Sequence, residues 1–279
     1  MAESARRVRV RDLQEKKQRG ERIAMLTVYD ATMARLLDRA GIDAVLVGDS
    51  LGMVIEGHDS TLPVTLDAIL HHTQAVTRGA RHALVVADMP FLTYQLTATE
   101  TLHNAGRLIQ QGGAAAVKLE GGRAVADVVA RLVDAGVPVM GHLGLLPQHV
   151  HQLSGYRMQA KTEFEAGQLI EDAKALEEAG AFSVVLESIP AEVAKTVTRE
   201  LQIPTIGIGA GPFCDGQILV SYDAFGLNDE SVPPFVRQYA NLAELMVEAA
   251  KAYAQDVRCG RFPLLDRHAR SSPGNGSGK

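Results

Sequence analysis

Residues 114–144 read AAAVKLEGGRAVADVVARLVDAGVPVMGHLG. The two ends of this stretch, residues 114–122 and 137–144, are short apolar runs of the length typical of strands. Between them, residues 123–136 repeat apolar side chains at helical spacing and end in Gly136, a residue type favoured just past a helix. Because the strand runs are nearly continuous rather than alternating, both faces of the sheet are expected to be covered. The stretch predicts a strand–helix–strand unit of a parallel sheet.

The same alternation extends over most of the chain. Apolar runs predict strands at residues 22–28, 43–50, 82–90, 114–122, 137–144, 181–190, 203–211 and 215–223. Helical patterns follow at residues 31–41, 65–79, 97–113, 123–136, 163–180, 191–201 and 235–257, and Asp30 stands where an N-cap is expected. Seven or eight such units favour a closed (β/α)8 TIM barrel over an open doubly wound sheet, which is the second choice. The Rossmann fingerprint is lacking, since GIGAG at 207–211 has another spacing and follows the seventh strand.

Length and composition are consistent with one α/β barrel domain. The chain has 279 residues, and 46% of them are hydrophobic, enough for a substantial core. We expect an N-terminal extension at 1–20, a catalytic barrel at 21–262 and a disordered, low-complexity tail at 263–279.

Charge and residue usage exclude several classes of protein. The net charge is −5 with mixed signs and there is no tryptophan, which argues against a nucleic-acid partner. The only cysteines, Cys214 and Cys259, are too few for a disulfide framework or a cysteine-based metal site. The charged N-terminus has no apolar signal region, and no run reaches the roughly 18 apolar residues of a membrane span. We therefore expect a cytoplasmic protein with no membrane partner.

Polar side chains gather where the predicted strands end. They are Asp49, Ser50, Asp88, Lys118, Glu120, His142 and Glu187. In a barrel these carboxyl ends converge on the face that carries active sites. A single aspartate after a strand is most often a helix cap, but ionisable groups at successive strand ends are hard to explain by capping.

The chemistry of this set points to a hard divalent cation. Asp49, Asp88 and Glu120 would repel one another unless a cation compensates, and oxygen ligands without cysteine select Mg²⁺ or Mn²⁺. Lys118 and Glu120 are two residues apart on a strand and therefore face the same side, where the lysine would bind an anionic substrate. Glu187, from across the barrel, is then free to act as a general base.

Other candidates are weaker. His149 and His151 have zinc-like spacing but no third ligand nearby, so we interpret them as loop histidines. His142 either binds substrate or is a hydrogen-bonded histidine at the core edge. Lys118 as a Schiff-base amine is disfavoured, because neighbouring carboxylates raise its pKa. Close approach of a phosphate or a tight turn would equally explain the glycines at 207, 209 and 211.

Several motifs together resemble one enzyme family. VLVGDSLGMVIEGHDSTLPVTLD at 45–67 closely resembles a signature of the ketopantoate hydroxymethyltransferases. The family's further motifs follow in order as VADMPF (86–91), VKLEGG (117–122), GHLGLLPQ (141–148), VVLESIPAE (184–192) and IPTIGIGAGPFCDGQILV (203–220). The resemblance covers roughly residues 10–265.

The resemblance implies a (β/α)8 barrel that transfers a hydroxymethyl group from 5,10-methylenetetrahydrofolate to 3-methyl-2-oxobutanoate. The product is 2-dehydropantoate, in the first committed step of pantothenate and coenzyme A biosynthesis, and the reaction passes through a Mg²⁺-stabilised enolate. The family typically forms a homodecamer. By position, the implied metal-site residues are Asp49, Asp88 and Glu120. The implied substrate-binding residues are Asp49, Ser50, Asp88, Lys118 and His142. Glu187 matches the proton acceptor.

Two departures and two rivals stay open. Ser154 and Ala160 stand where the family usually has glycines, in a loop that could cover the site, and the C-terminal LLDRHARSSPGNGSGK differs from the family's usual ending. A lyase resembling isocitrate lyase or phosphoenolpyruvate mutase would share the metal chemistry, although such enzymes usually carry a cysteine near strand five and none occurs there. A barrel without catalytic activity is the second rival.

Overall fold

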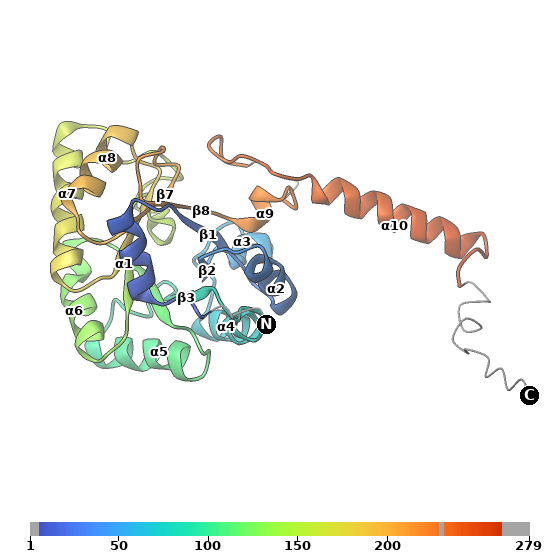
Figure 1. Ribbon diagram of the computed structural model, residues 1–279, viewed down its shortest axis with the longest axis horizontal. Helices are drawn as coiled ribbons and strands as arrows, with labels where there is room; N and C mark the ends of the chain where they lie inside the picture. Colours follow the sequence, from blue (N-terminus) through green and yellow to red (C-terminus); the bar gives the residue numbers. More distant parts are fainter. Residues whose placement is uncertain (1–5, 229–231, 264–279) are drawn as a thin grey trace, which may run out of the picture. The chain divides into compact units, whose positions relative to one another are not determined.

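The computed structural model describes residues 6–228 and 232–263. Eight parallel strands pair with their sequence neighbours, and β1 closes the ring against β8 (Figure 1). They are β1 (Ile23–Thr27), β2 (Ala44–Val47), β3 (Leu84–Asp88), β4 (Ala116–Glu120), β5 (Val139–Gly144), β6 (Ser183–Glu187), β7 (Thr205–Ile208) and β8 (Gly216–Leu219). The predicted closed barrel is confirmed, and the open sheet is wrong.

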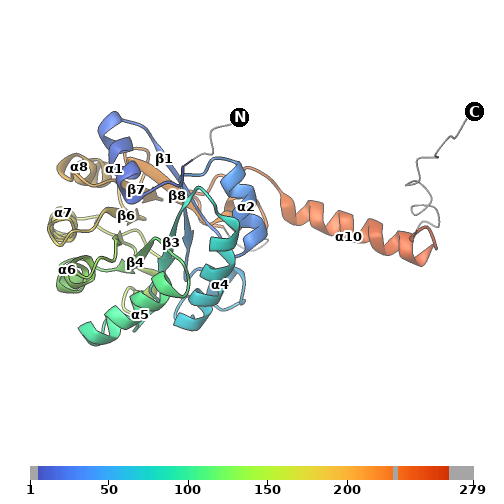
Figure 2. The same cartoon turned by 60° about the horizontal axis from the view of Figure 1, so that its bottom comes forward.

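Helices surround the strands, as Figure 2 shows. They are α2 (Ala31–Arg39), α4 (Leu66–Gly79), α5 (Ala98–Gln110), α6 (Ala126–Asp134), α7 (Glu163–Glu178) and α8 (Ala191–Glu200). Shorter elements are α3 (Leu51–Val54), η1 (Arg123–Val125), η2 (Pro147–His149) and α9 (Ser221–Ala224). Asp30 caps α2 as predicted, since its carboxylate accepts hydrogen bonds from the backbone N–H groups of Thr32 and Met33.

Two helices differ from the sequence prediction. α1 (Val10–Arg19) was not predicted, because most of its residues are charged or polar and only Leu13 is buried, so no apolar face marks a helix in the sequence. The last helix, α10, spans Leu242–Arg258 instead of 235–257. The N–H groups of Val236, Tyr239 and Leu242 are bonded to the carbonyls of Pro233, Ala224 and Phe225. These backbone N–H groups before and at Leu242 therefore bond to carbonyls outside the helix, and the helix begins only at Leu242.

The chain divides into two compact units. The first comprises the barrel, up to residue 221 and again at 233–236. The second holds the remaining described residues, including α10. The boundaries 1–20, 21–262 and 263–279 stay a prediction, and residues 264–279 lie outside the described part. In the described ranges, no helix is both long and apolar enough to cross a membrane.

The barrel interior is filled by alternate residues of the strands. These residues are Ile23, Met25, Ala44, Leu46, Leu84, Val86, Ala116, Met140, Val185, Ile206 and Ile218. Leu13 of α1 and Phe182 belong to the same buried cluster. Because strand side chains alternate with period two, Lys118 and Glu120 share the inward face of β4 with Ala116. The apolar core thus gives way to charge toward the carboxyl ends.

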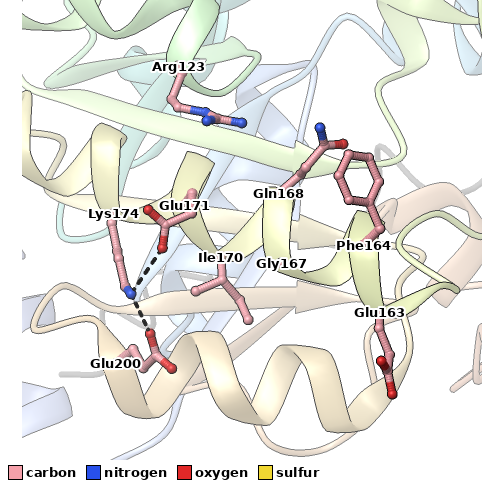
Figure 3. Close-up of a pocket in the computed structure, with 9 residues that line it drawn as sticks. All are labelled: Arg123, Glu163, Phe164, Gly167, Gln168, Ile170, Glu171, Lys174 and Glu200. Atoms are coloured by element: carbon pink, nitrogen blue, oxygen red, sulfur yellow. Dashed lines mark hydrogen bonds and ion pairs between the residues drawn. The ribbon is translucent and has the colours of Figure 1, made fainter.

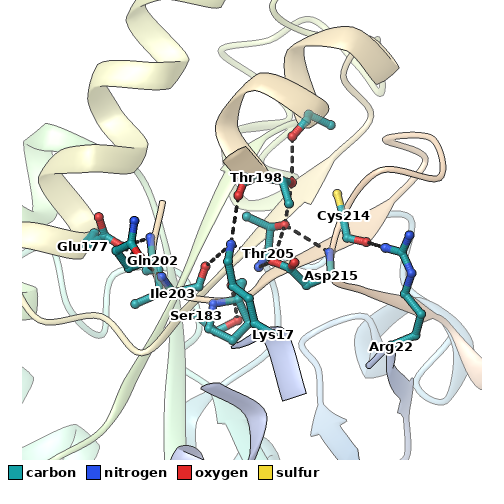
Figure 4. Close-up of polar contacts among 12 residues, drawn as sticks. Lys17, Arg22, Glu177, Ser183, Thr198, Gln202, Ile203, Thr205, Cys214 and Asp215 are labelled. Atoms are coloured by element: carbon teal, nitrogen blue, oxygen red, sulfur yellow. Dashed lines mark hydrogen bonds and ion pairs between the residues drawn. The ribbon is translucent and has the colours of Figure 1, made fainter. Parts of the chain in front are cut away.

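A partly buried lysine of α1 connects this helix to the amino ends of β7 and β8 (Figure 4). Lys17 Nζ donates hydrogen bonds to the carbonyls of Thr198 (2.9 Å) and Ile203 (3.0 Å) and to Asp215 Oδ2 (2.9 Å). The same Asp215 oxygen accepts from the Thr205 backbone N–H at 2.9 Å. This network lies at the end of the barrel where β7 and β8 begin, opposite the strand ends that carry the predicted site.

Candidate active site

Strand register places the predicted site residues next to one another. Asp88 at the end of β3 is paired with Lys118 of β4, and Glu120 of β4 is paired with His142 of β5. Glu187 ends β6 and is paired with Gly144 of β5. Except for Glu187, these ionisable side chains are buried. The convergence that the sequence predicted is therefore present in the structure.

Direct contacts link four of the strands. Lys118 Nζ lies 2.9 Å from Asp88 Oδ1 and 3.2 Å from His142 Nδ1. His142 Nε2 lies 3.0 Å from Glu187 Oε2, and its Nδ1 lies 3.5 Å from Glu120 Oε1. The carboxylates of three strands thus share two nitrogen-bearing side chains.

Asp49 and Ser50 join this group from the turn after β2. The Asp49 backbone N–H donates to Asp88 Oδ2 at 2.9 Å. Ser50 Oγ lies 2.9 Å from the Tyr29 hydroxyl. A Cβ at Gly48 would lie 2.8 Å from Ser50 Oγ and 3.4 Å from Asp88 Oδ2. A side chain at this position would therefore displace the Ser50 hydroxyl from its place beside Tyr29.

Neighbouring charges make the pKa values of the three buried acidic groups differ. Burial, followed by the charges of Asp88 and Glu120, raises the pKa of Asp49 well above that of an ordinary aspartate. Burial also raises the pKa of Asp88, although Lys118 opposes the shift. For Glu120 burial is outweighed by His142 and Lys118, so its pKa is lowered. The pocket does not readily hold three negative charges without a further cation.

The two basic groups are charged in this setting. Burial disfavours the Lys118 ammonium, but Asp88, Glu120 and Asp49 raise its pKa above the usual value. Burial and Lys118 both lower the pKa of His142, and hydrogen bonds to Glu120 and Glu187 outweigh them and raise it to about 9. We therefore take His142 as an imidazolium at neutral pH. Its contact with Lys118 then joins like charges, which the surrounding carboxylates offset.

The acidic group fits a divalent cation that is completed by other ligands. Asp88 Oδ1 and Glu120 Oε1 are buried, and each is held in an ion pair, with Lys118 at 2.9 Å and with His142 at 3.5 Å. Among the described residues, no three His, Cys, Asp or Glu side chains are arranged to hold a metal by themselves. Mg²⁺ commonly takes one or two carboxylates and fills its other positions with water and substrate oxygens. The carboxylates of Asp49, Asp88 and Glu120 fit this mode of Mg²⁺ coordination.

Three further polar residues of the site were missed by the sequence reasoning. Gln148 of η2 contacts the Asp49 carboxylate, and Tyr94 contacts the Gln148 side chain and the Glu120 backbone, as described below; both residues are buried. Tyr29 follows β1 and contacts Ser50. Gln148 lies within the motif GHLGLLPQ, which was the available signal. The sequence prediction rested on polar side chains at strand ends, whereas these three residues are uncharged and lie in the segments that follow the strands.

The weaker candidates are explained without ligands. Gly209 and Gly211 have positive φ values of 63° and 77°. A Cβ on Gly209 would lie 2.7 Å from the Phe235 ring, and one on Gly211 would lie 2.5 Å from the Ala191 Cβ. Tight turns and close packing therefore require these glycines. His149 is a loop histidine that contacts Gln152 at 3.1 Å.

The loop after β5 reaches the predicted site through Tyr156. Burial and the charges of Asp49, Glu187 and Glu120, three carboxylates of the site, raise the pKa of Tyr156. The hydroxyl lies 3.7 Å from Met53 Sδ. Ser154 and Ala160, which flank Tyr156, have positive φ values of 56° and 55°. The resemblance predicted glycines at these two positions, and the structure has a left-handed backbone there with side chains that disfavour it.

Ser154 offers a direct test of that strain. Replacing exposed Ser154 by Gly is expected to raise the free energy of unfolding by about 0.5–1 kcal/mol, because relief of the left-handed strain exceeds the added chain entropy of glycine. Thermal unfolding would measure the gain. The matched control is Ser60→Gly, since φ at Ser60 is not positive and the change should destabilise. A Ser154→Gly protein no more stable than the parent would show that the loop relaxes without cost.

A shallow hollow on the outer wall is separate from this site. It is lined by Arg123, Glu163, Phe164, Gly167, Gln168, Ile170, Glu171, Lys174 and Glu200 (Figure 3). Lys174 pairs with Glu171 at 3.2 Å and with Glu200 at 2.9 Å. These charged groups are exposed and paired with one another, so the hollow does not compete with the strand ends as a catalytic site.

Comparison with known proteins gives a consistent picture. A family model described as ketopantoate hydroxymethyltransferase matches residues 7–264. The 3-methyl-2-oxobutanoate hydroxymethyltransferase of Moorella thermoacetica is 56% identical over 92% of this chain and 96% of its own length. The protein of the same name from Chloroflexus aggregans is 54% identical over 96% and 95%.

Solved structures share the fold at much lower identity. A phosphonopyruvate hydrolase in complex with oxalate and Mg²⁺ has a TM-score of 0.60 at 14% identity, covering 95% of this chain and 92% of that one. A 2,3-dimethylmalate lyase of the phosphoenolpyruvate mutase/isocitrate lyase superfamily has a TM-score of 0.58 at 17% identity, with the same coverage. These likenesses support the barrel architecture alone.

Proposed function

Because the chain belongs to the ketopantoate hydroxymethyltransferase family of enzymes, we propose that it transfers a hydroxymethyl group from 5,10-methylenetetrahydrofolate to 3-methyl-2-oxobutanoate. The product would be 2-dehydropantoate, an intermediate of pantothenate biosynthesis. The observation that carries this proposal is the buried group of Asp49, Asp88 and Glu120 beside Lys118, with Glu187 at its edge. That arrangement suits a 2-oxo acid that must be bound through its oxygens and deprotonated at the adjacent carbon.

Asp49 and Asp88 would hold Mg²⁺ directly, with Glu120 reaching it through water. When bound, the cation would withdraw electron density from the keto group and so acidify the C3 proton. The support from this chain is electrostatic. Burial raises the pKa values of Asp49 and Asp88, so a cation bound between them would stabilise both as carboxylates.

Lys118 and Ser50 would fix the orientation of the substrate. The Lys118 ammonium is buried and charged, so it can bind a substrate carboxylate or keto oxygen at little reorganisation cost. Ser50 Oγ, 2.9 Å from the Tyr29 hydroxyl, would lie beside a second substrate oxygen. His142 would line the same pocket from β5. Holding the 2-oxo acid planar between these groups would leave its C3–H bond directed to one side.

Glu187 would remove the C3 proton. Its carboxylate is the least buried of the four acidic groups, and His142 Nε2 holds it at 3.0 Å. Gly144 allows the Leu145 N–H to reach the Glu187 carbonyl at 2.8 Å, because a Cβ there would lie 2.2 Å from that oxygen. The carbon freed of its proton would attack the methylene carbon of the folate. Tetrahydrofolate would leave, and one water would supply the oxygen of the new hydroxyl group.

The assembly and the compartment are proposed on the family resemblance. We place the chain in a homodecamer in the cytoplasm, with small molecules as its other partners. The lyase rival is less well supported, since its representatives share 14–17% identity with this chain against 54–56% for the hydroxymethyltransferases. The retained carboxylates, lysine and Glu187 argue against a barrel without catalytic activity.

The test is product formation by the purified protein. We would mix it with 3-methyl-2-oxobutanoate and 5,10-methylenetetrahydrofolate, with Mg²⁺ or with excess EDTA, and follow 2-dehydropantoate by NMR. The expected result is product with Mg²⁺ and a loss of product with EDTA. Exchange of the C3 proton in D₂O without product would support the deprotonating site and contradict the folate donor. The absence of both exchange and product would overturn the proposed reaction.

A further inference from the structure

The side chain of Gln148 bridges two of the acidic residues. Its Nε2 donates to Asp49 Oδ2 at 2.8 Å and to the Met89 carbonyl at 3.0 Å. Its backbone N–H donates to Glu120 Oε2 at 3.1 Å. Gln148 is 3% exposed, so these hydrogen bonds are shielded from water. A single residue of the loop after β5 therefore holds carboxylates that come from β2 and β4.

Tyr94 fixes which way the Gln148 amide faces. The Tyr94 hydroxyl donates to Gln148 Oε1 at 2.7 Å and accepts from the Glu120 N–H at 3.2 Å. With a donor on one side of the amide and two acceptors on the other, a flipped amide would lose all three bonds. Tyr94 is 1% exposed, so no water replaces its hydroxyl. The orientation that presents N–H to Asp49 is therefore the one that satisfies every group.

The three acidic side chains share one pattern of hydrogen bonding. In each of them one oxygen accepts from a neutral N–H group: Asp49 Oδ2 from Gln148 Nε2, Asp88 Oδ2 from the Asp49 backbone, and Glu120 Oε2 from the Gln148 backbone. The second oxygens of Asp88 and Glu120 are buried and face the charged side chains of Lys118 and His142. Neutral donors fix the carboxylates without cancelling their charge, so the second oxygens can interact with cationic groups.

We propose that Gln148 is a positioning residue for the cation site, which orients the carboxylates of Asp49 and Glu120 toward the cation, and that Tyr94 acts through it. This inference rests on the proposed function, since it concerns the metal that the reaction would use. Partners that orient metal ligands in this way typically affect metal affinity by 10- to 100-fold when removed. Gln148 touches neither substrate nor reacting atoms in this scheme.

The experiment measures metal binding directly, with Mn²⁺ as the probe and electron paramagnetic resonance or calorimetry as the readout. Gln148→Met keeps the length of the side chain and removes both the N–H donors and the carbonyl acceptor of its amide. We expect its Kd for Mn²⁺ to rise about 10- to 100-fold. Tyr94→Phe keeps the ring and loses one hydroxyl, and its Kd should rise roughly 2- to 10-fold. Because Tyr94 acts through Gln148, the double variant should lose less than the product of the two factors.

The control is Gln152→Met, four residues further along the same loop. Gln152 is exposed and contacts His149, so its replacement should leave the Mn²⁺ affinity unchanged. A positioning role also predicts that saturating Mg²⁺ restores much of kcat to Gln148→Met, which a misfolded variant would not show. If Gln148→Met does not fold, Tyr94→Phe carries the test.

The outcomes separate this inference from the proposed function. A wild-type protein that binds Mn²⁺ while Gln148→Met and Tyr94→Phe bind it equally well would overturn the role of Gln148 and leave the reaction standing. A wild-type protein that binds no Mn²⁺, with or without 3-methyl-2-oxobutanoate, would overturn the metal site and this inference with it.

Discussion

Replacing Glu187 by Gln is expected to slow exchange of the C3 proton of 3-methyl-2-oxobutanoate by about 10²- to 10⁴-fold. The amide keeps the shape of the side chain but cannot accept the proton. The exchange is followed by NMR in D₂O with Mg²⁺ and without folate, so the readout isolates deprotonation from the transfer step. Mn²⁺ affinity should stay near that of the parent, because Glu187 is outside the group of Asp49, Asp88 and Glu120.

Two further variants sharpen this expectation. Glu187→Asp retains a carboxylate on a shorter side chain and should keep part of the exchange. Glu192→Gln is the matched control, since Glu192 lies on α8, is 76% exposed in its side chain and pairs with Lys195. Its replacement should change nothing. Exchange by Glu187→Gln at the parent rate would assign the proton to another base and leave Glu187 a role in the folate step.

The barrel could be predicted from the sequence because its signals are local and repeated. Each strand is a short apolar run, and each following helix carries its own apolar face, so strand and helix types can be identified without knowledge of the partners. Helix α2 shows how local the signal is, since Asp30 caps it through its own side chain. The helix α1 had no such signal. Its one buried residue, Leu13, becomes visible only when the barrel that it contacts is present.

The charged part of the site could be predicted for a geometric reason. In parallel strands the carboxyl ends meet, so Asp88, Lys118, Glu120 and His142 had to converge once the barrel was assumed. Their observed register partners, Asp88 with Lys118 and Glu120 with His142, follow from that. The uncharged supports were out of reach. Gln148 reaches Asp49, 99 residues away in the chain, through a loop conformation that no periodicity describes.

Division of labour between the two ends of the barrel follows from the same geometry. At the carboxyl ends, the charges of Asp88, Lys118, Glu120 and His142 are buried together, which costs stability and provides chemistry. At the amino ends, Lys17 satisfies two carbonyls and a carboxylate, and Asp215 is further held by Thr205. Function and stability thus depend on different residues. A change at the amino ends should leave metal binding unaffected, and a change at the carboxyl ends should leave the Lys17 network unaffected.

Replacing Lys17 by Met is accordingly expected to lower the free energy of unfolding by about 3 kcal/mol, which corresponds to a fall in Tm of roughly 6–12 °C. Lys17 and Asp215 are only 14% and 16% exposed in their side chains, and the change leaves Asp215 and the carbonyls of Thr198 and Ile203 short of a donor. Mn²⁺ affinity should be unaffected.

Arg11→Met on the same helix is the control for the Lys17 experiment. Arg11 is 84% exposed in its side chain and pairs with Glu15 at the surface, so its loss should have little effect on Tm. Asp215→Asn in the Lys17→Met background should recover part of the loss, because the uncompensated charge is then removed. The expectation would be contradicted if Lys17→Met and Arg11→Met had the same Tm. Water would then replace the hydrogen bonds to Thr198, Ile203 and Asp215, and α1 would stabilise the barrel through the burial of Leu13 instead.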